Sequence, residues 1–223
     1  MARPDLPHPL SAYDDEQLRA ALRLRLVALD SLASIEDLPH LRALAPGVVE
    51  VLTLDLPDTI VTPPMAYLAH LGTSEELIAA GREHLSDLIA AGLQRREVVA
   101  EDGLRFSFLH GDDYSQSSVA LLLPTALRAA EPDADLTRGV AVAVPDRHHV
   151  AYRLLQGLES LMALGPMAAF ARNGFDSGDG PISPDVYWAR GPRLDQWTAL
   201  TEQRPDGIAI GIPPELTALV EDD

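Results

Sequence analysis

Hydrophobic and polar residues alternate along Leu104–Leu109, and the period changes after Gly111. Alternation of this kind is typical of a half-buried strand. Further on, apolar residues recur three and four positions apart, which predicts a helix. That helical face comprises Val119, Leu122, Leu123, Ala126 and Leu127. We expect Asp113 and Gln116 to form a capping pair at the start of this helix, and Pro124 either to kink it or to open a second helical segment.

The first 45 residues predict a flexible lead-in followed by two helices. Residues 1–10 carry three prolines, so an extended segment without regular structure is expected there. Asp14 and Gln17 make a capping pair for the first helix. Its apolar face is expected to hold Leu18, Ala21, Leu22, Leu26 and Leu29. A second short helix is expected to begin near Asp37 and to end before Pro46.

Two strands and a longer helix are expected next. Val48–Asp55 is almost entirely apolar and rich in β-branched residues, which predicts a strand covered on both faces and central in its sheet. Thr59–Thr62 is short enough to be its return strand. Thr73 and Glu76 have the spacing of a capping box, so a helix is expected to begin there and to end at Gly92.

The middle of the chain predicts two strand pairs. Arg95–Glu101 and Leu104–His110 are joined by Asp102-Gly103, a dipeptide that favours a hairpin turn. Val140–Val144 consists of five small apolar residues in succession, which only burial on both faces explains, so an interior strand is expected. Val150–Leu154 is the expected return strand.

The last part of the chain predicts a helix, two strands and a terminal helical turn. The helix is expected over Glu159–Arg172, with a kink at Pro166 and its end at Gly174. A loop over 176–184 then leads to an aromatic strand at Val186–Ala189. Glycine alternates with isoleucine over 207–212, which favours a strand that another backbone approaches closely, and the prolines at 213 and 214 open the terminal turn.

Pairs of strands separated by helices favour an α+β fold with a mainly antiparallel sheet, because a doubly wound parallel sheet needs strands and helices to alternate singly. We expect residues 11–223 to form a single domain, since a chain of 223 residues with 47% hydrophobic content can bury one substantial core.

The chain is strongly acidic, with 34 acidic and 17 basic residues and a formal net charge of −17. Such a surface repels phosphate backbones and anionic lipid headgroups, so neither nucleic acid nor a membrane is an expected partner. The charge favours a basic protein as partner. The competing interpretation is that the acidity serves solubility.

Cysteine is absent, which excludes disulfides, thiolate nucleophiles and cysteine-ligated zinc, and which fits a reducing compartment. The N-terminus lacks the apolar core of a secretory signal, and no apolar run approaches the length of a membrane span. A soluble, cytoplasmic protein is therefore expected.

Five segments occur in a particular order along the chain. They are DLPD at Asp55–Asp58, the helix at Ser74–Leu88, FSFLHGDDYSQSSVALLL at Phe106–Leu123, VAVPDRHHV at Val142–Val150 and GPISPDVYW at Gly180–Trp188. In this order the chain resembles a divergent member of the YtpQ-like family of bacterial proteins, over residues 48–195. The resemblance implies a soluble intracellular α+β domain and brings with it no known activity, cofactor or catalytic residue. The family's D-G-Y-D-A-S-R loop is replaced here by DDYSQSS at 112–118, so one acidic and one basic residue of that loop are missing.

Histidine and aspartate residues gather at two predicted turns. The first turn holds His110, Asp112 and Asp113, and the second holds Asp146, His148 and His149. Both turns adjoin predicted strands, so neighbouring strands would bring His110, Asp112, Asp146 and His149 together as candidate metal ligands. Against a metal site, no H-E-x-x-H spacing occurs, and aspartate at a helix start has an ordinary capping role. A Ser115, His149 and Asp146 triad is weaker still, because the chain lacks a G-x-S-x-G motif.

Three aromatic residues, Tyr187, Trp188 and Trp197, are candidates for partner binding, since such side chains are favoured anchors at interfaces. Packing in the core is the competing interpretation. Because no motif has catalytic spacing, we expect no catalytic residue and no cofactor, and a non-enzymatic protein-binding module of adaptor, chaperone-like or immunity type. The alternative is a metal-dependent enzyme or a metal-binding protein that uses the His110/Asp112 and Asp146/His149 turns.

Overall fold

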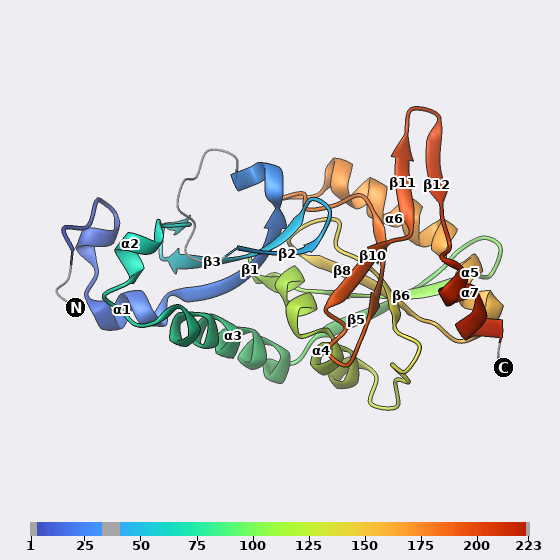
Figure 1. Cartoon of the computed structure of the whole chain (residues 1–223), viewed down its shortest axis with the longest axis horizontal. Coiled ribbons are helices and arrows are strands. Elements are labelled where there is room, and N and C mark those ends of the chain that lie inside the picture. The colour runs from blue at the N-terminus through green and yellow to red at the C-terminus, as the bar shows by residue number, and fades with distance from the viewer. Residues whose placement is uncertain (1–3, 33–40, 222–223) are drawn as a thin grey trace.

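The computed structural model describes residues 4–32 and 41–221. Within these ranges the chain forms the α+β fold that the sequence predicts, with antiparallel strands in two main sheets and one separate hairpin. Figure 1 shows an elongated molecule, with the first sheet and the N-terminal helices toward one end and the second sheet toward the other.

The two sheets divide the strands by position in the chain. The first sheet has the order β1 (Leu22–Ala28), β3 (Val48–Leu56), β2 (Leu41–Ala45), with β4 (Thr59–Val61) pairing with β3. The second has the order β10 (Gln196–Ala199), β9 (Val186–Arg190), β7 (Val140–Ala143), β8 (His149–Leu154), β6 (Arg105–His110), β5 (Gln94–Val99). The hairpin of β11 (Thr201–Arg204) and β12 (Gly207–Ile210) projects from the body of the molecule (Figure 1).

Helices cover both sheets. The α-helices of the described residues are α1 (Asp15–Ala20), α2 (Met65–Leu68), α3 (Ser74–Ala91), α4 (Leu123–Ala130), α5 (Gly157–Met162), α6 (Leu164–Ser177) and α7 (Pro214–Glu221). The 3-10 helices are η1 (Leu10–Ala12), η2 (Leu29–Leu32) and η3 (Gln116–Leu122). No helix in these ranges is both long enough and apolar enough to cross a membrane.

The strands predicted to be interior occupy the interior. β3 lies between β1 and β2, and β7 lies between β8 and β9 with all four of its residues buried. The predicted capping box of α3 is also confirmed, since the Thr73 hydroxyl accepts from the Glu76 N–H and the Glu76 carboxylate accepts from the Thr73 N–H. That helix ends before Gly92, whose φ of 108° favours glycine.

The first predicted helix is wrong beyond Ala20. Asp14 and Gln17 form the expected capping box, but β1 begins two residues after the helix ends. Leu22, Leu24 and Leu26 are buried and alternate with arginines, so the period of two decides the structure here rather than the helical spacing. The predicted helix near Asp37 lies largely outside the described residues, and its last part, from residue 41, is strand β2.

The structure also corrects the start of the helix after the central turn. The Asp113 carboxylate accepts a hydrogen bond from the Ser115 N–H at 2.7 Å, so it closes a turn ahead of the helix and does not cap it. The segment that follows is the 3-10 helix η3, and α4 then starts as a second segment with Pro124 in its first turn. Two roles were expected for Pro124, and the structure shows the second: Pro124 opens a new helical segment and does not kink a continuous helix.

Three expectations for the C-terminal part need correction. The helix predicted over Glu159–Arg172 is two helices that divide at Ala163, with Pro166 in the first turn of α6 rather than at a kink. Gly174 lies inside α6, where a Cβ would come within 2.8 Å of Pro145. A Cβ built on Gly207 or Gly211 has no described neighbour within 4 Å, so no close approach requires glycine at either position, although the Gly211 N–H donates to the Leu200 carbonyl at 2.8 Å.

η3 lies between the two sheets and hydrogen-bonds toward both. The Ser118 hydroxyl accepts from the N–H of Leu26 in β1 at 3.0 Å. The Ser117 N–H donates to the carbonyl of Arg147, in the turn before β8, at 2.9 Å. Val119 beside them is completely buried in the core shared by both sheets. The 3-10 helix therefore holds the two sheets together.

Ser118→Ala is expected to lower the free energy of unfolding by about 1–3 kcal/mol, because it leaves the buried N–H of Leu26 without an acceptor. Chemical denaturation measures the change. Ser86→Ala is the matched control, since that hydroxyl bonds to a carbonyl on the exposed face of α3. Equal midpoints for the two variants would contradict the proposed role of Ser118.

Candidate functional site

The two histidine turns meet at one end of the second sheet. β6 and β8 are antiparallel neighbours, and His110 and His149 are register partners at the end of that pair. The condition for convergence, that the two strands be neighbours, is therefore met. The rings of both histidines lie next to Phe108, with centroids 5.5 Å and 5.6 Å from it. Phe170 of α6 packs on the same phenylalanine, so the histidines border an aromatic cluster.

Asp146 organises the second turn. Its carboxylate is buried and accepts hydrogen bonds from the backbone N–H groups of His148 and His149 at 2.8 Å and 3.1 Å. Both of its oxygens also lie 2.9 Å from Nδ1 of His149. A carboxylate in this position fixes the orientation of the ring and leaves Nε2 as the atom directed elsewhere.

Gly178, the residue directly after α6, leaves room for this turn. A Cβ at Gly178 would lie 2.6 Å from Oδ2 of Asp146, which is closer than any real contact of this kind. The backbone φ of Gly178 is −76°, so the close approach, and not its conformation, explains the glycine. The turn and the end of α6 are thus fitted to each other.

His148 is engaged at both ring nitrogens. Its Nε2 lies 3.0 Å from Nε of Arg147, which can only donate, so Nε2 accepts. Its Nδ1 lies 3.1 Å from the carbonyl oxygen of Gly111 and therefore carries the proton. His148 is a neutral ring that joins the two turns, and it has no lone pair left for a metal.

The remaining candidate ligands do not complete a metal centre. Asp112 is exposed, and the Asp113 carboxylate is used by the turn that it closes. Among residues 4–32 and 41–221, no three histidine, aspartate or glutamate side chains are placed to hold one metal ion. No hydrogen bond joins Ser115 to His149 in these ranges, and Ser115 is 3% exposed. The arrangement that does exist is a carboxylate–imidazole pair, Asp146 and His149, which can orient a proton acceptor.

The three aromatic candidates for partner binding lie in the core. Tyr187, Trp188 and Trp197 are 1%, 2% and 8% exposed. The two indole N–H groups donate to the carbonyls of Arg138 and Leu194. The Tyr187 hydroxyl is 2.6 Å from that of Ser183, and burial raises the pKa of Tyr187 to about 12. These side chains therefore do not form a contact surface, and the competing interpretation of core packing describes them.

Exposed apolar side chains occur instead on α5 and α7, which pack against each other (Figure 1). Leu158 and Met162 of α5 are 56% and 64% exposed, and Leu219 of α7 is 39% exposed. The inner faces of the two helices are filled by other residues, including Leu161 and Leu216. We call this region the α5–α7 surface. Sequence reasoning missed it because the helix was predicted to begin at Glu159, so Leu158 and Met162 were not recognised as residues of one helical face.

Comparison with models of protein families, with curated proteins and with solved structures gave no match. Membership of the YtpQ-like family therefore stays a prediction, and the site is interpreted from its own geometry.

The first test of the histidine turns is the pH dependence of stability. Burial lowers the pKa of His110, and the positive charge of Arg96 lowers it further, while Asp112 acts in the opposite direction. As the pH falls through about 6.5, the ordinary pKa of histidine, the imidazole of His110 is protonated in the unfolded chain before it is protonated in the folded chain. The free energy of unfolding is then expected to fall with pH until the folded-state pKa is passed.

His110→Gln is expected to reduce this slope below about pH 7, and the lost contact with Phe108 is expected to change stability by an amount that does not depend on pH. Urea titrations across the range measure the slope, and a histidine-detected NMR titration assigns it. His8→Gln is the control because His8 is exposed in the N-terminal segment. A slope that is the same in the His110 variant and the parent protein would show that another group is responsible.

Proposed function

We propose that this chain is a non-enzymatic protein-binding module, and that the α5–α7 surface receives a basic, amphipathic segment of a partner protein. The observation that carries the proposal is the exposure of Leu158 and Met162, four residues apart on α5, together with that of Leu219 on the helix packed against it, since exposed apolar patches mark interaction sites.

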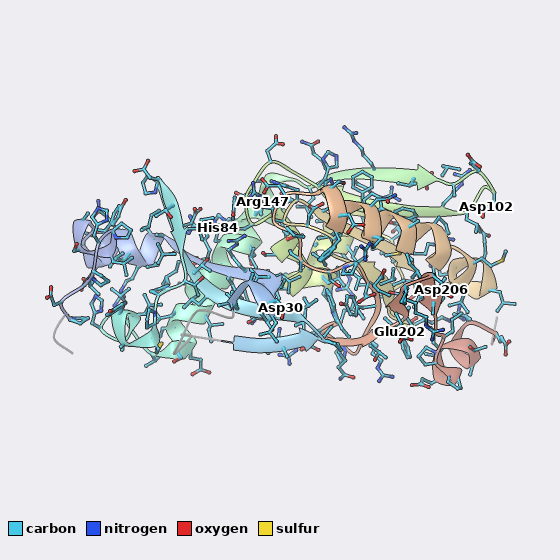
Figure 2. The ribbon with its side chains drawn as sticks, turned by 90° about the horizontal axis from the view of Figure 1, so that it is seen from above. Asp30, His84, Asp102, Arg147, Glu202 and Asp206 are labelled. Carbon is cyan, nitrogen blue, oxygen red and sulfur yellow. The ribbon has the colours of Figure 1, made fainter. Side chains whose placement is uncertain are left out.

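Acidic residues accompany these apolar side chains. The side chains of Glu159 in α5 and Glu215 in α7 are 68% and 56% exposed. Each faces one arginine at 3.7–3.8 Å, and exposed pairs at that distance are weak and readily exchanged. Figure 2 places Asp102, Glu202 and Asp206 in the same half of the molecule as α6. A partner that brings positive charge beside an apolar face would match this combination.

The chemistry of the whole chain supports the same partner class. An excess of 17 acidic residues, from 34 less 17, gives a negative field that raises encounter rates with positive surfaces. The apolar side chains would then determine how long the complex lasts, because rim charges act mainly on association and buried contacts on dissociation. A cytoplasmic location accompanies this proposal, on the basis of the absence of cysteine.

A double variant, Leu158→Ser with Met162→Ser, is expected to weaken binding of the partner at least about tenfold, since it removes two exposed apolar anchors. The partner is isolated on the tagged protein at low salt, identified by mass spectrometry and titrated in purified form. Leu29→Ser is the matched control because Leu29 is also a large exposed apolar residue, at 43%, and lies in η2 beside strand β1 of the first sheet.

The proposal also requires that the purified partner have a basic segment and that its affinity fall as salt rises. A partner that is acidic, or that binds the double variant as tightly as the parent protein, would reject the α5–α7 surface as the binding site.

The second candidate function is a metal-binding protein or a metal-dependent enzyme that uses the two histidine turns. The observation in its favour is the register pairing of His110 with His149, together with the hydrogen bond from His149 to Asp146. Elemental analysis separates the two candidates. One equivalent of zinc or manganese that disappears in a His110→Ala, His149→Ala double variant would favour this second function.

A further inference from the structure

A pocket of about 280 Å³ opens where the two sheets meet, and arginines from three separate elements line it. Arg42 comes from β2, Arg82 from α3, and Arg193 from the loop between β9 and β10. The apolar wall of the pocket is formed by Leu121, Leu122, Pro124 and Pro192. It lies apart from the α5–α7 surface and from the histidine turns, with which it shares no residue.

Two carboxylates lie among these arginines. Glu50 is 1% exposed, and Nη2 and Nε of Arg42 donate to its Oε2 at 2.5 Å and 3.1 Å. Arg82 reaches the other oxygen of Glu50 at 3.9 Å. Asp195 lies 3.2 Å from Nη2 of Arg193 and 3.6 Å from Nη1 of Arg42. A buried carboxylate needs such pairing, which explains Arg42 in structural terms.

Pairing does not account for all of the positive charge. Counting Glu50 with the described residues that line the pocket, three arginines face two carboxylates, a surplus of one positive charge (3 less 2). The side chain of Arg82 is 43% exposed, and its Nη2 lies 3.9 Å from Oε1 of Glu50, which is the longest of these ion pairs, so Arg82 is the arginine least committed to a carboxylate.

We propose that this pocket binds a monocarboxylate that carries an apolar group. The planar fork of a guanidinium matches a carboxylate in geometry, and the apolar group would rest on the leucine and proline wall. The volume suits a small ligand. A single negative charge balances the local surplus, whereas a doubly charged phosphate exceeds it within a chain of net charge −17.

The acidic surface elsewhere does not prevent such binding. Salt screens charges beyond about 8 Å at physiological ionic strength, so the groups within the pocket dominate the field that a ligand meets there. The carboxylate has two possible sources, a free small acid or the C-terminus of a peptide. Both present the same group to the arginines, and the experiment below distinguishes them.

The test titrates the full chain with benzoate, with its neutral analogue benzamide and with inorganic phosphate, followed by calorimetry and by NMR shifts of Leu121 and Leu122. Benzoate is expected to bind more tightly than benzamide and phosphate. Arg193→Gln and Arg82→Gln are each expected to weaken benzoate binding about tenfold, as loss of a charge-assisted hydrogen bond does. Arg193 is 82% exposed, so its replacement is not expected to disturb folding.

Arg105→Gln is the matched control, since it removes the same charge from an exposed pair on β6 and is expected to leave benzoate affinity unchanged. A second arm compares a short apolar peptide with a free C-terminus against the same peptide with an amidated one. Stronger binding of the free-terminus peptide than of benzoate identifies a peptide as the source, and the reverse identifies a small acid. Equal affinity for benzoate and benzamide, or affinity that neither pocket variant lowers, would overturn the proposal.

Discussion

The hydrogen bond between the Ser118 hydroxyl and the Leu26 N–H joins the two halves of this molecule, and the rest of the fold is arranged around that junction. Residues 115–118 are polar yet buried, which is stable only because their groups find partners. At the surface of the same junction, the guanidinium groups of Arg25 and Arg147 both lie over the Tyr114 ring, at 4.4 Å and 3.9 Å from its centroid. The turn thus combines polar and cation–π contacts to both sheets, and Figure 2 shows Arg147 near the middle of the molecule.

Local signals predicted the elements whose structure is decided locally. β7 is identified by continuous small apolar residues, and α3 by its capping box and terminal glycine. Leucine and arginine alternate over Leu22–Leu26, but leucines of this segment also match one face of a helix, so the sequence fits a period of two and a period of 3.6. Pairing with β3 decides for the strand, and this pairing depends on residues far away in the chain. The interpretation of Gly207–Ile212 failed for a related reason. The glycines indicated a close neighbour, but within residues 4–32 and 41–221 β12 pairs only with β11, in a hairpin that projects from the body.

For the candidate sites, the sequence indicated the histidine turns but not their internal chemistry. Their convergence follows from strand order, which depends on contacts far apart in the chain. His148 is used at both nitrogens because Arg147 and Gly111 lie beside its ring, and the end of α6 packs on the same turn, where Gly178 leaves room for the Asp146 carboxylate. The exposure of Leu158 and Met162 could not be predicted either. Helix periodicity shows which residues share a face, but it does not show whether another element covers that face.

The distribution of the basic residues explains how one chain presents two opposite kinds of surface. All 17 are arginine, and several are used where the halves of the molecule join, at Arg25, Arg42, Arg82 and Arg147. Arginine suits such positions because its planar group stacks on rings and pairs with carboxylates while staying charged. Other arginines, among them Arg105, Arg193 and Arg204, lie on the outer surface, where the acidic residues outnumber the basic ones over the whole chain. The proposed basic partner and the proposed carboxylate ligand would therefore meet different parts of the same charge distribution, the first the net acidic surface and the second the arginines gathered at the junction.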